Sequence, residues 1–202
     1  MRAEDIELPA VMSRAGPQEA AQVAAITADS FRYDPFNRWL FGNFESMALA
    51  FGGLARTLYA RRGYCYWHGN EGAAMWMLPG GGSSLPLAAL PTLAKVALKS
   101  SRGGLRRRWH TVQAMEAHHP KFDHAYLFTV GVRPAAQGKG LGGQIIRPVL
   151  EACDRAGVPA YLENSNPANS GFYAGHGFER VEMIHPLPGS PPLEAMIRRP
   201  RS

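Results

Sequence analysis

A glycine-rich segment between residues 137 and 143 has the residue types and the spacing that phosphate binding requires. It reads Gln-Gly-Lys-Gly-Leu-Gly-Gly, with four glycines in six positions, and the amphipathic pattern of a helix begins directly after it. Glycine leaves backbone N–H groups uncovered by a Cβ atom, and at the positive end of a helix dipole such groups bind phosphate or pyrophosphate. The alternative is a flexible turn that needs glycine only for its tight geometry. The number and placing of the glycines favour the phosphate site.

Two common phosphate-binding patterns fit this segment poorly. The P-loop pattern fails because the lysine is followed by Gly140, where that motif has serine or threonine. The first, second and fourth glycines satisfy the dinucleotide pattern G-x-G-x-x-G, and Glu163 follows twenty residues after Gly143, where a ribose-binding acid would lie. That fold, however, turns tightly off its strand, whereas five residues separate Val132 from Gly138. Only 59 residues follow Gly143, which is too few for the remaining strands of such a sheet.

A third pattern fits throughout, and with its flanks the segment resembles the GNAT superfamily of acyl-CoA N-acyltransferases. The phosphate motif of that superfamily is Gln/Arg-x-x-Gly-x-Gly/Ala, which residues 137–142 match. The preceding Thr-Val-Gly-Val-x-Pro at 129–134 resembles the family's cofactor-facing strand. The later Asn-Ser-Gly-Phe-Tyr-x-x-x-Gly-Phe at 169–178 resembles a further signature of the same family.

Within the superfamily, the region from about Tyr126 onward is most similar to the puromycin N-acetyltransferase subgroup. Shared segments include Arg-Ala-Gly-Val-Pro-Ala at 155–160 and Leu-Glu-x-Ser at 162–165. The resemblance implies acetyl-CoA as the cofactor, with its pantetheine arm paired to backbone N–H groups of the strand that ends at Val132. The cofactor-binding residues that it implies are Val130, Gly131, Val132, Gln137, Gly138, Lys139, Gly140, Leu141, Gly142, Gly143 and Asn169.

Transfer of an acetyl group from a thioester to an amine requires a neutral amine, a polarised carbonyl group and a stabilised departing thiolate. Glu163 is the candidate general base, because it lies at the end of a predicted central strand, where open α/β sheets place their sites. The alternative for Glu163 is a capping or salt-bridging carboxylate. Tyr173 is the candidate acid, because a phenol can donate a proton to sulfur without being charged itself, and the alternative is a core tyrosine. We expect direct attack of the amine within a ternary complex.

By family resemblance, the acceptor pocket is expected among aromatic residues of the N-terminal half. These candidates, each of which could instead belong to the core, are Phe31, Tyr33, Trp39, Tyr64, Tyr66 and Trp76. Their aromatic character suits a flat amine, and the lack of an acidic cluster among these segments disfavours a polycationic one. His118, His119 and His124 suggest a metal site or a base, but no thiolate or carboxylate completes a ligand set at metal-site spacing. We therefore interpret the histidines as part of a polar turn and expect no bound metal.

The positive charge of the chain is concentrated in one segment. The 202 residues carry 22 Lys and Arg against 16 Asp and Glu, for a net charge of +6. Six cations and no acid lie between residues 95 and 108, so the rest of the chain has 16 cations against 16 acids. Any interaction with nucleic acid is thereby restricted to this segment. Its cations are Lys95, Lys99, Arg102, Arg106, Arg107 and Arg108.

Three functions are compatible with these observations. The leading one is an N-acetyltransferase that acts on the primary amine of a small molecule and has no nucleic-acid partner. The second keeps this chemistry but uses an amine of a protein or of an aminoacyl nucleic acid, guided by the 95–108 segment. The third is a non-catalytic nucleic-acid-binding protein on the same scaffold.

Composition narrows the setting in which this function is expected. A hydrophobic content of 46% excludes a disordered chain, and two cysteines exclude a disulfide framework. The charged first residues lack the pattern of a signal peptide, and the uncharged run 72–94 is interrupted by prolines. We expect a cytoplasmic protein without a membrane partner, as a monomer or homodimer.

The hydrophobic pattern predicts the elements that must position the site. Together with the resemblance, it predicts an α/β fold, a single mixed-sheet GNAT domain of about seven strands with helices on both faces. Residues 1–122 are expected to form the acceptor-side half, with a basic helical insertion at 87–118, and residues 123–202 the acetyl-CoA-binding half. Strands are predicted at 10–15, 64–68, 73–78, 125–132, 160–164, 178–185 and 193–198. Helices are predicted at 17–34, 44–61, 87–118, 141–156 and 169–175.

Overall fold

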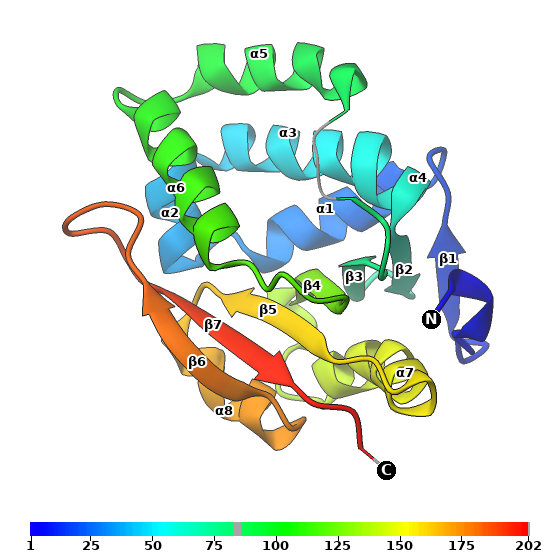
Figure 1. Cartoon of the computed structure of the whole chain (residues 1–202). Coiled ribbons are helices and arrows are strands. Elements are labelled where there is room, and N and C mark those ends of the chain that lie inside the picture. Colours follow the sequence, from blue (N-terminus) through cyan, green and yellow to red (C-terminus); the bar gives the residue numbers. More distant parts are fainter. Residues whose placement is uncertain (83–85, 202) are drawn as a thin grey trace.

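A seven-stranded sheet forms the centre of the computed structural model, which describes residues 1–82 and 86–201 (Figure 1). The strand order is β1-β2-β3-β4-β5-β7-β6. All neighbouring strands are antiparallel except β4 and β5, which are parallel. The predicted mixed sheet of an α/β fold is therefore confirmed. The strands are β1 Met12–Ala15, β2 Tyr64–His68, β3 Gly72–Met77, β4 Ala125–Val132, β5 Ala160–Asn164, β6 Glu179–Ile184 and β7 Leu193–Arg198.

Helices cover both faces of the sheet, with a hydrophobic cluster on each side (Figure 1). The first six lie on one side, where α5 is outermost and packs on α3, and the last two lie on the other side. The helices are α1 Ala20–Ser30, α2 Pro35–Phe41, α3 Phe44–Leu54, α4 Ala60–Arg62, α5 Leu90–Lys99, α6 Gly104–His118, α7 Leu141–Ala156 and α8 Ser170–Gly175. None of the helices in the described ranges combines the length and the apolar character needed to cross a bilayer.

Three helical segments differ from the prediction. The predicted helix 44–61 consists of α3, a π-helical turn at Ala55–Tyr59 and α4. The predicted stretch 87–118 is divided into α5 and α6, because the chain turns through Gly103 at a φ of +77°. The sequence pattern ends a helix at Asp34-Pro35, whereas a new helix, α2, starts there. Pro35 suits its first turn, and the Asp34 carboxylate caps it by accepting a bond of 2.8 Å from the backbone N–H of Asn37.

Candidate active site

The parallel strands β4 and β5 are paired only at their beginnings. Their register covers Ala125 with Ala160 and Tyr126 with Tyr161, although β4 continues to Val132 and β5 to Asn164. On its other side, β4 pairs with β3 as far as Val132. On the edge that faces β5, the backbone N–H and carbonyl groups of the later part of β4 are therefore not hydrogen-bonded to another strand. An extended ligand with amide groups can pair with such an edge as an added strand does.

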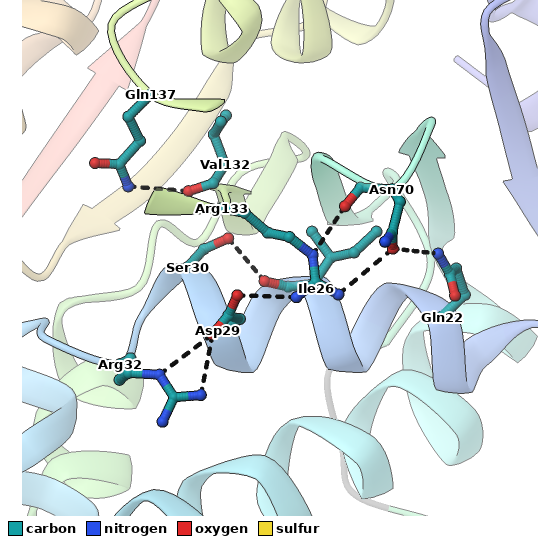
Figure 2. Close-up of polar contacts among 9 residues, drawn as sticks. All are labelled: Gln22, Ile26, Asp29, Ser30, Arg32, Asn70, Val132, Arg133 and Gln137. Carbon is teal, nitrogen blue, oxygen red and sulfur yellow. Dashed lines mark hydrogen bonds and ion pairs between the residues drawn. The ribbon is translucent and has the colours of Figure 1, made fainter. Parts of the chain in front are cut away.

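The glycine-rich segment follows this open edge directly. The side-chain amide of Gln137 donates to the carbonyl oxygen of Val132 at 2.9 Å and so holds the segment against the end of β4 (Figure 2). Gly138 and Gly140 both have a φ of +77°, and open space lies where a Cβ atom would be placed at either. α7 begins at Leu141, so the N–H groups of its first turn have no intrahelical partner. Exposed, convergent N–H groups of this kind form an anion site.

The third and fourth glycines have a packing role. A Cβ atom on Gly142 would lie 3.2 Å from the ring of Phe172, and one on Gly143 would lie 3.0 Å from Nε2 of His176. Both aromatic side chains come from the α8 region, which packs closely against the first turn of α7. The glycine pattern therefore combines two requirements, a left-handed turn at the first two positions and close helix packing at the last two.

A polar cluster around Arg133 fixes the turn between β4 and the glycine-rich segment (Figure 2). The Arg133 guanidinium donates to the Asp29 carboxylate at 2.8 Å and to the carbonyl oxygen of Asn70 at 2.8 Å. Arg32 donates to the same carboxylate at 3.0 Å. Burial acts to raise the pKa of Asp29, but the bonds from Arg32 and Arg133 outweigh it and hold that pKa below its usual range. The cluster joins α1 and the β2–β3 turn to the end of β4.

Glu163, the candidate base, lies in a nest of tyrosines on β5. Its side chain is 2% exposed, and Oε1 has no hydrogen-bond partner among residues 1–82 and 86–201. Burial, followed by the charge of Glu163, raises the pKa values of the Tyr59, Tyr126 and Tyr161 hydroxyls. These phenols therefore remain neutral, and Glu163 is the carboxylic acid side chain of the cluster.

Two histidines, which the sequence pattern assigns to a polar turn, lie beside this carboxylate. Nδ1 of His119 is 3.7 Å from Oε1 of Glu163, and Nε2 of His119 is 3.1 Å from Nε2 of His124. In the part of the chain that the structure describes, no group of three or more His, Cys, Asp or Glu side chains is arranged to hold a metal. The histidines are absent from the predicted site residues, because their contact with Glu163 depends on how β4 and β5 are paired.

Tyr173, the candidate acid, lies elsewhere in the site. It is 8% exposed on α8, with its ring centre 6.0 Å from that of Phe178. Burial, with a smaller contribution from the charge of Asp34, raises its pKa, so the phenol keeps its proton at neutral pH. No hydrogen bond, ion pair or ring contact links Tyr173 to Glu163 in the described ranges.

Asp34 is a further buried acid that the sequence pattern does not single out. Its Oδ2 accepts a bond of 2.8 Å from the hydroxyl of Ser165, which lies just after β5. Burial raises the pKa of Asp34, although bonds from Asn37 and Ser165 oppose the shift. The carboxylate therefore joins the start of α2 to the end of β5 and lies close enough to Tyr173 to affect its hydroxyl. Asn169, by contrast, is exposed at the start of α8.

The structure places some of the aromatic acceptor candidates in the core and others nearer the surface. Tyr66 and Trp76 are fully buried. The Tyr66 hydroxyl donates to the carbonyl oxygen of Ile145 at 2.5 Å, and the Trp76 indole donates to that hydroxyl at 3.3 Å. Both belong to the core beneath α7, as does Tyr64, and neither side chain is exposed for contact with an acceptor. Phe31 and Trp39 are half-buried against the other core cluster.

Tyr33 is the acceptor candidate that lies in the open, with 72% of its surface exposed. It contributes to a surface pocket of about 340 Å³ at the α1–α2 junction and the start of α3. The guanidinium of Arg32, another lining residue, stacks 3.7 Å above the ring centre of Phe44. The lining consists of Arg32, Tyr33, Asn37, Arg38, Gly42, Asn43, Phe44 and Met47.

The 95–108 segment uses half of its cations to hold the helices together. Lys99 pairs with Glu45 at 2.6 Å, which joins α5 to α3. Arg107 donates to the Ser101 hydroxyl at 2.7 Å, and Arg108 donates to the Ser100 hydroxyl at 2.7 Å. The other three cations, Lys95, Arg102 and Arg106, are exposed. The segment is therefore in part a structural connection between helices.

Comparison with known proteins agrees with this geometry. Residues 103–178 match the model of the acetyltransferase (GNAT) family. An uncharacterised N-acetyltransferase of Schizosaccharomyces pombe is 40% identical over 83 residues, which are 40% of this chain and 34% of that relative's length. The family match is confined to residues 103–178, and the chain spans about a third of the length of this curated relative.

Two solved structures of acetyltransferases share the fold over nearly the whole chain. One is described as histone acetyltransferase HPA2 and related acetyltransferase, from Corynebacterium glutamicum. It has a TM-score of 0.68 at 22% identity, over 95% of this chain and 97% of that chain. Arylalkylamine N-acetyltransferase 2 from Aedes aegypti has a TM-score of 0.64 at 10% identity, over 94% and 98%.

Proposed function

We propose that the protein transfers an acetyl group from acetyl-CoA to the primary amine of a small molecule, by direct attack within a ternary complex. The observation that carries the proposal is the continuity of the unpaired edge of β4 with the exposed N–H groups of the glycine-rich segment. A pantetheine arm can pair with the former while a pyrophosphate binds the latter. The buried Glu163 carboxylate lies on β5, across the opening from this edge.

The proposed cofactor contacts follow from this placement. Backbone groups of Val130, Gly131 and Val132 bind the pantetheine arm and polarise the thioester carbonyl group. The segment from Gln137 to Gly143 binds the pyrophosphate, with exposed Lys139 adding a positive charge, and Asn169 contacts the cofactor from the opposite wall. Residues 123–202 thereby form the cofactor half of one domain, and residues 1–122 the acceptor half.

Replacing Gly140 with alanine is expected to weaken acetyl-CoA binding by about tenfold or more. The φ of +77° at this position costs a residue with a Cβ atom about 1–2 kcal/mol, so the segment moves away from its binding geometry. Isothermal titration of acetyl-CoA measures the change. Gly52→Ala is the matched control, because its Cβ atom meets nothing within 4 Å and its φ is ordinary. Equal affinities for both variants would contradict the placement of the pyrophosphate.

Tyr173 is proposed as the acid that protonates the departing thiolate. Its raised pKa keeps the proton available, and Asp34 and Ser165 position the neighbouring end of β5. Tyr173→Phe preserves the buried ring and is expected to lower kcat by about tenfold with the acetyl-CoA affinity unchanged. Tyr64→Phe is the control, since that tyrosine is equally buried in the core. An unchanged kcat for Tyr173→Phe in a thiol-release assay would assign Tyr173 to the core alone.

A small-molecule acceptor is favoured by the pocket beside Tyr33. Its volume of about 340 Å³ lies within the range of small-molecule sites. Two arginines and no acid line it, which disfavours a polycationic amine. Phe31 and Trp39, half-buried against the core, are proposed as further contacts of the acceptor. The arylalkylamine N-acetyltransferase named above acts, by its name, on arylalkylamines, and such amines are the first class to test.

The decisive experiment is a thiol-release assay with acetyl-CoA and a panel of amines. Arylalkylamines and aminonucleosides are expected to be turned over, whereas lysine peptides, protein N-termini and aminoacyl nucleic acids are not. Turnover of only the macromolecular amines would favour the second acceptor class. Binding of RNA or DNA without any turnover, weakened by salt, would support the non-catalytic alternative. No binding of acetyl-CoA in titration would overturn the proposal.

A further inference from the structure

The proposed base is buried, and this creates a requirement for a proton exit. An amine that enters as an ammonium ion leaves as an amide, so each turnover releases one proton: RNH3⁺ and acetyl-CoA give RNHCOCH3, CoASH and H⁺. With a side chain that is 2% exposed, Glu163 has little direct access to solvent. The group that lies at its unpartnered Oε1 is the His119 ring, at 3.7 Å.

The hydrogen-bond partners of the two imidazoles determine which ring nitrogen carries the hydrogen in each neutral ring. Nδ1 of His124 is 2.7 Å from the carbonyl oxygen of Phe122, which can only accept, so this nitrogen carries the hydrogen. In neutral His124, Nε2 is then an acceptor, and the facing Nε2 of His119 carries the hydrogen of their 3.1 Å bond. The remaining nitrogen of His119, Nδ1, therefore presents a lone pair to Glu163. Their separation of 3.7 Å exceeds hydrogen-bond distance, so a proton held by the carboxyl group passes along this line when the two side chains approach each other.

The His119 ring is held in this orientation by aromatic edges from two strands. Its centre lies 5.0 Å from the ring centre of Tyr126 on β4 and 5.2 Å from that of Tyr161 on β5, nearly perpendicular to both. The ring also borders a surface pocket of about 290 Å³, which His124 lines as well. A path thus leads from the buried carboxylate through one imidazole to a site open to solvent.

The protonation states of the surrounding groups are compatible with proton transfer from Glu163 through His119 to the pocket. The buried hydroxyls of Tyr59, Tyr126 and Tyr161 keep their protons, because burial and the charge of Glu163 both raise their pKa values. Burial lowers the pKa of His124 and His119 adds to the shift, although the Phe122 carbonyl, Glu163 and Asp123 oppose it. On the outer side, Glu182 of β6 lies 3.7 Å from His118. His124 is therefore neutral near pH 7 and free to accept the bond that orients His119.

We propose that His119 discharges the proton of Glu163 into the solvent of this pocket, with His124 fixing the tautomer of His119. The O–H bond of protonated Glu163 breaks as an N–H bond forms at Nδ1 of His119. The resulting imidazolium lies between the regenerated carboxylate and the lone pair of His124, and its Nδ1–H bond then breaks as the proton passes to water in the pocket, which restores the starting tautomer of His119. Both histidines act through Glu163 and are positioning residues. The inference rests on the proposed acetyl transfer, with Glu163 as its base.

The test compares His119→Ala with His118→Ala, a neighbouring histidine outside this path. His119→Ala is expected to lower kcat by about tenfold to a hundredfold while the acetyl-CoA affinity stays within about twofold. Millimolar imidazole, which can enter the vacated position, is expected to restore most of the lost rate, and kcat becomes dependent on buffer concentration. His118→Ala is expected to match the native protein and to show no response to imidazole.

A second pair of variants separates proton transfer from packing. In His124→Gln, the side-chain oxygen can still accept the hydrogen of His119, whereas in His124→Leu it cannot. The glutamine variant is expected to keep the pH profile of kcat between about pH 6 and 9, and the leucine variant to shift it. Loss of rate in His119→Ala without imidazole rescue, or equal profiles for the two His124 variants, would overturn the relay. Absence of turnover in the native protein with every amine would instead overturn the proposed function.

Discussion

Replacement of Glu163 by glutamine is expected to lower kcat by about 10²- to 10⁴-fold, the range for loss of a general base. The amide has nearly the shape of the carboxylate but cannot accept a proton from the ammonium ion. Because the proposed cofactor contacts lie on β4 and the glycine-rich segment, the acetyl-CoA affinity is expected to stay within about twofold. A thiol-release assay and isothermal titration measure the two quantities.

The same substitution is expected to leave the thermal stability unchanged or to increase it. Oε1 of Glu163 is buried without a hydrogen-bond partner in the described ranges, and removing a carboxylate from water costs free energy that a neutral amide does not cost to the same extent. Lower activity with equal or greater stability is a signature of a functional group and not of a structural one. Glu179→Gln, an exposed acid on β6, is the control and is expected to change neither property. A stability loss in Glu163→Gln that parallels the rate loss would show that Glu163 is structural.

The sequence predicts those parts of the site whose geometry depends on residues adjacent in the chain. Gly138 and Gly140 turn out to have left-handed backbones, and the apolar run at 125–132 is the strand β4. Both depend on residues adjacent in the chain, through glycine's conformational freedom and through the hydrophobic pattern. The placing of Glu163 at the end of β5 also follows from such a pattern.

The contacts made across the fold could not be predicted in this way. His119 meets Glu163 because Tyr126 pairs with Tyr161, and no pattern in a single sequence specifies the pairing of parallel strands so distant in the chain. Tyr66 and Trp76 were ambiguous for another physical reason. β2 and β3 are largely buried on both faces, so period-two alternation cannot separate core positions from pocket positions.

The different roles of the four glycines could not be predicted from the sequence for a similar reason. Gly142 and Gly143 lie within a motif that predicts phosphate binding, yet their missing side chains leave room for Phe172 and His176. The pattern from 169 to 178 and the glycine-rich segment are thus two halves of one contact. Their joint occurrence in the sequence reflects the packing of α8 on α7 as well as the cofactor.

Arg198→Met is expected to destabilise the protein by about 1.5–3 kcal/mol, the usual contribution of hydrogen bonds to a charged group, because the partner Asp154 is 24% exposed and does not become a fully buried, unpaired charge. The Arg198 side chain is 3% exposed and donates to both oxygens of Asp154 at 2.7 Å, while its Nε donates to the carbonyl oxygen of His176 at 2.9 Å. These bonds join the last strand, β7, to the end of α7 and to the residue that follows α8. Chemical denaturation at pH 7 measures the loss, and Arg147→Met, at an exposed position on α7, is the control, with an expected change below about 1 kcal/mol.

The difference between native protein and Arg198→Met is expected to shrink as the pH falls. The bond from Arg198 lowers the pKa of Asp154 against the opposing effect of burial, and the N–H and charge of Arg201 lower it further. A carboxyl group with a folded pKa below its unfolded value of about 3.9 contributes stability above that value and loses it as the pH falls through the folded pKa. At acid pH the native protein also retains a buried, charged guanidinium without its partner, which adds to the decline. Denaturation curves at neutral and acid pH test this, and a difference that stays constant would show that Arg198 stabilises the fold through its contact with His176 and its packing rather than through Asp154.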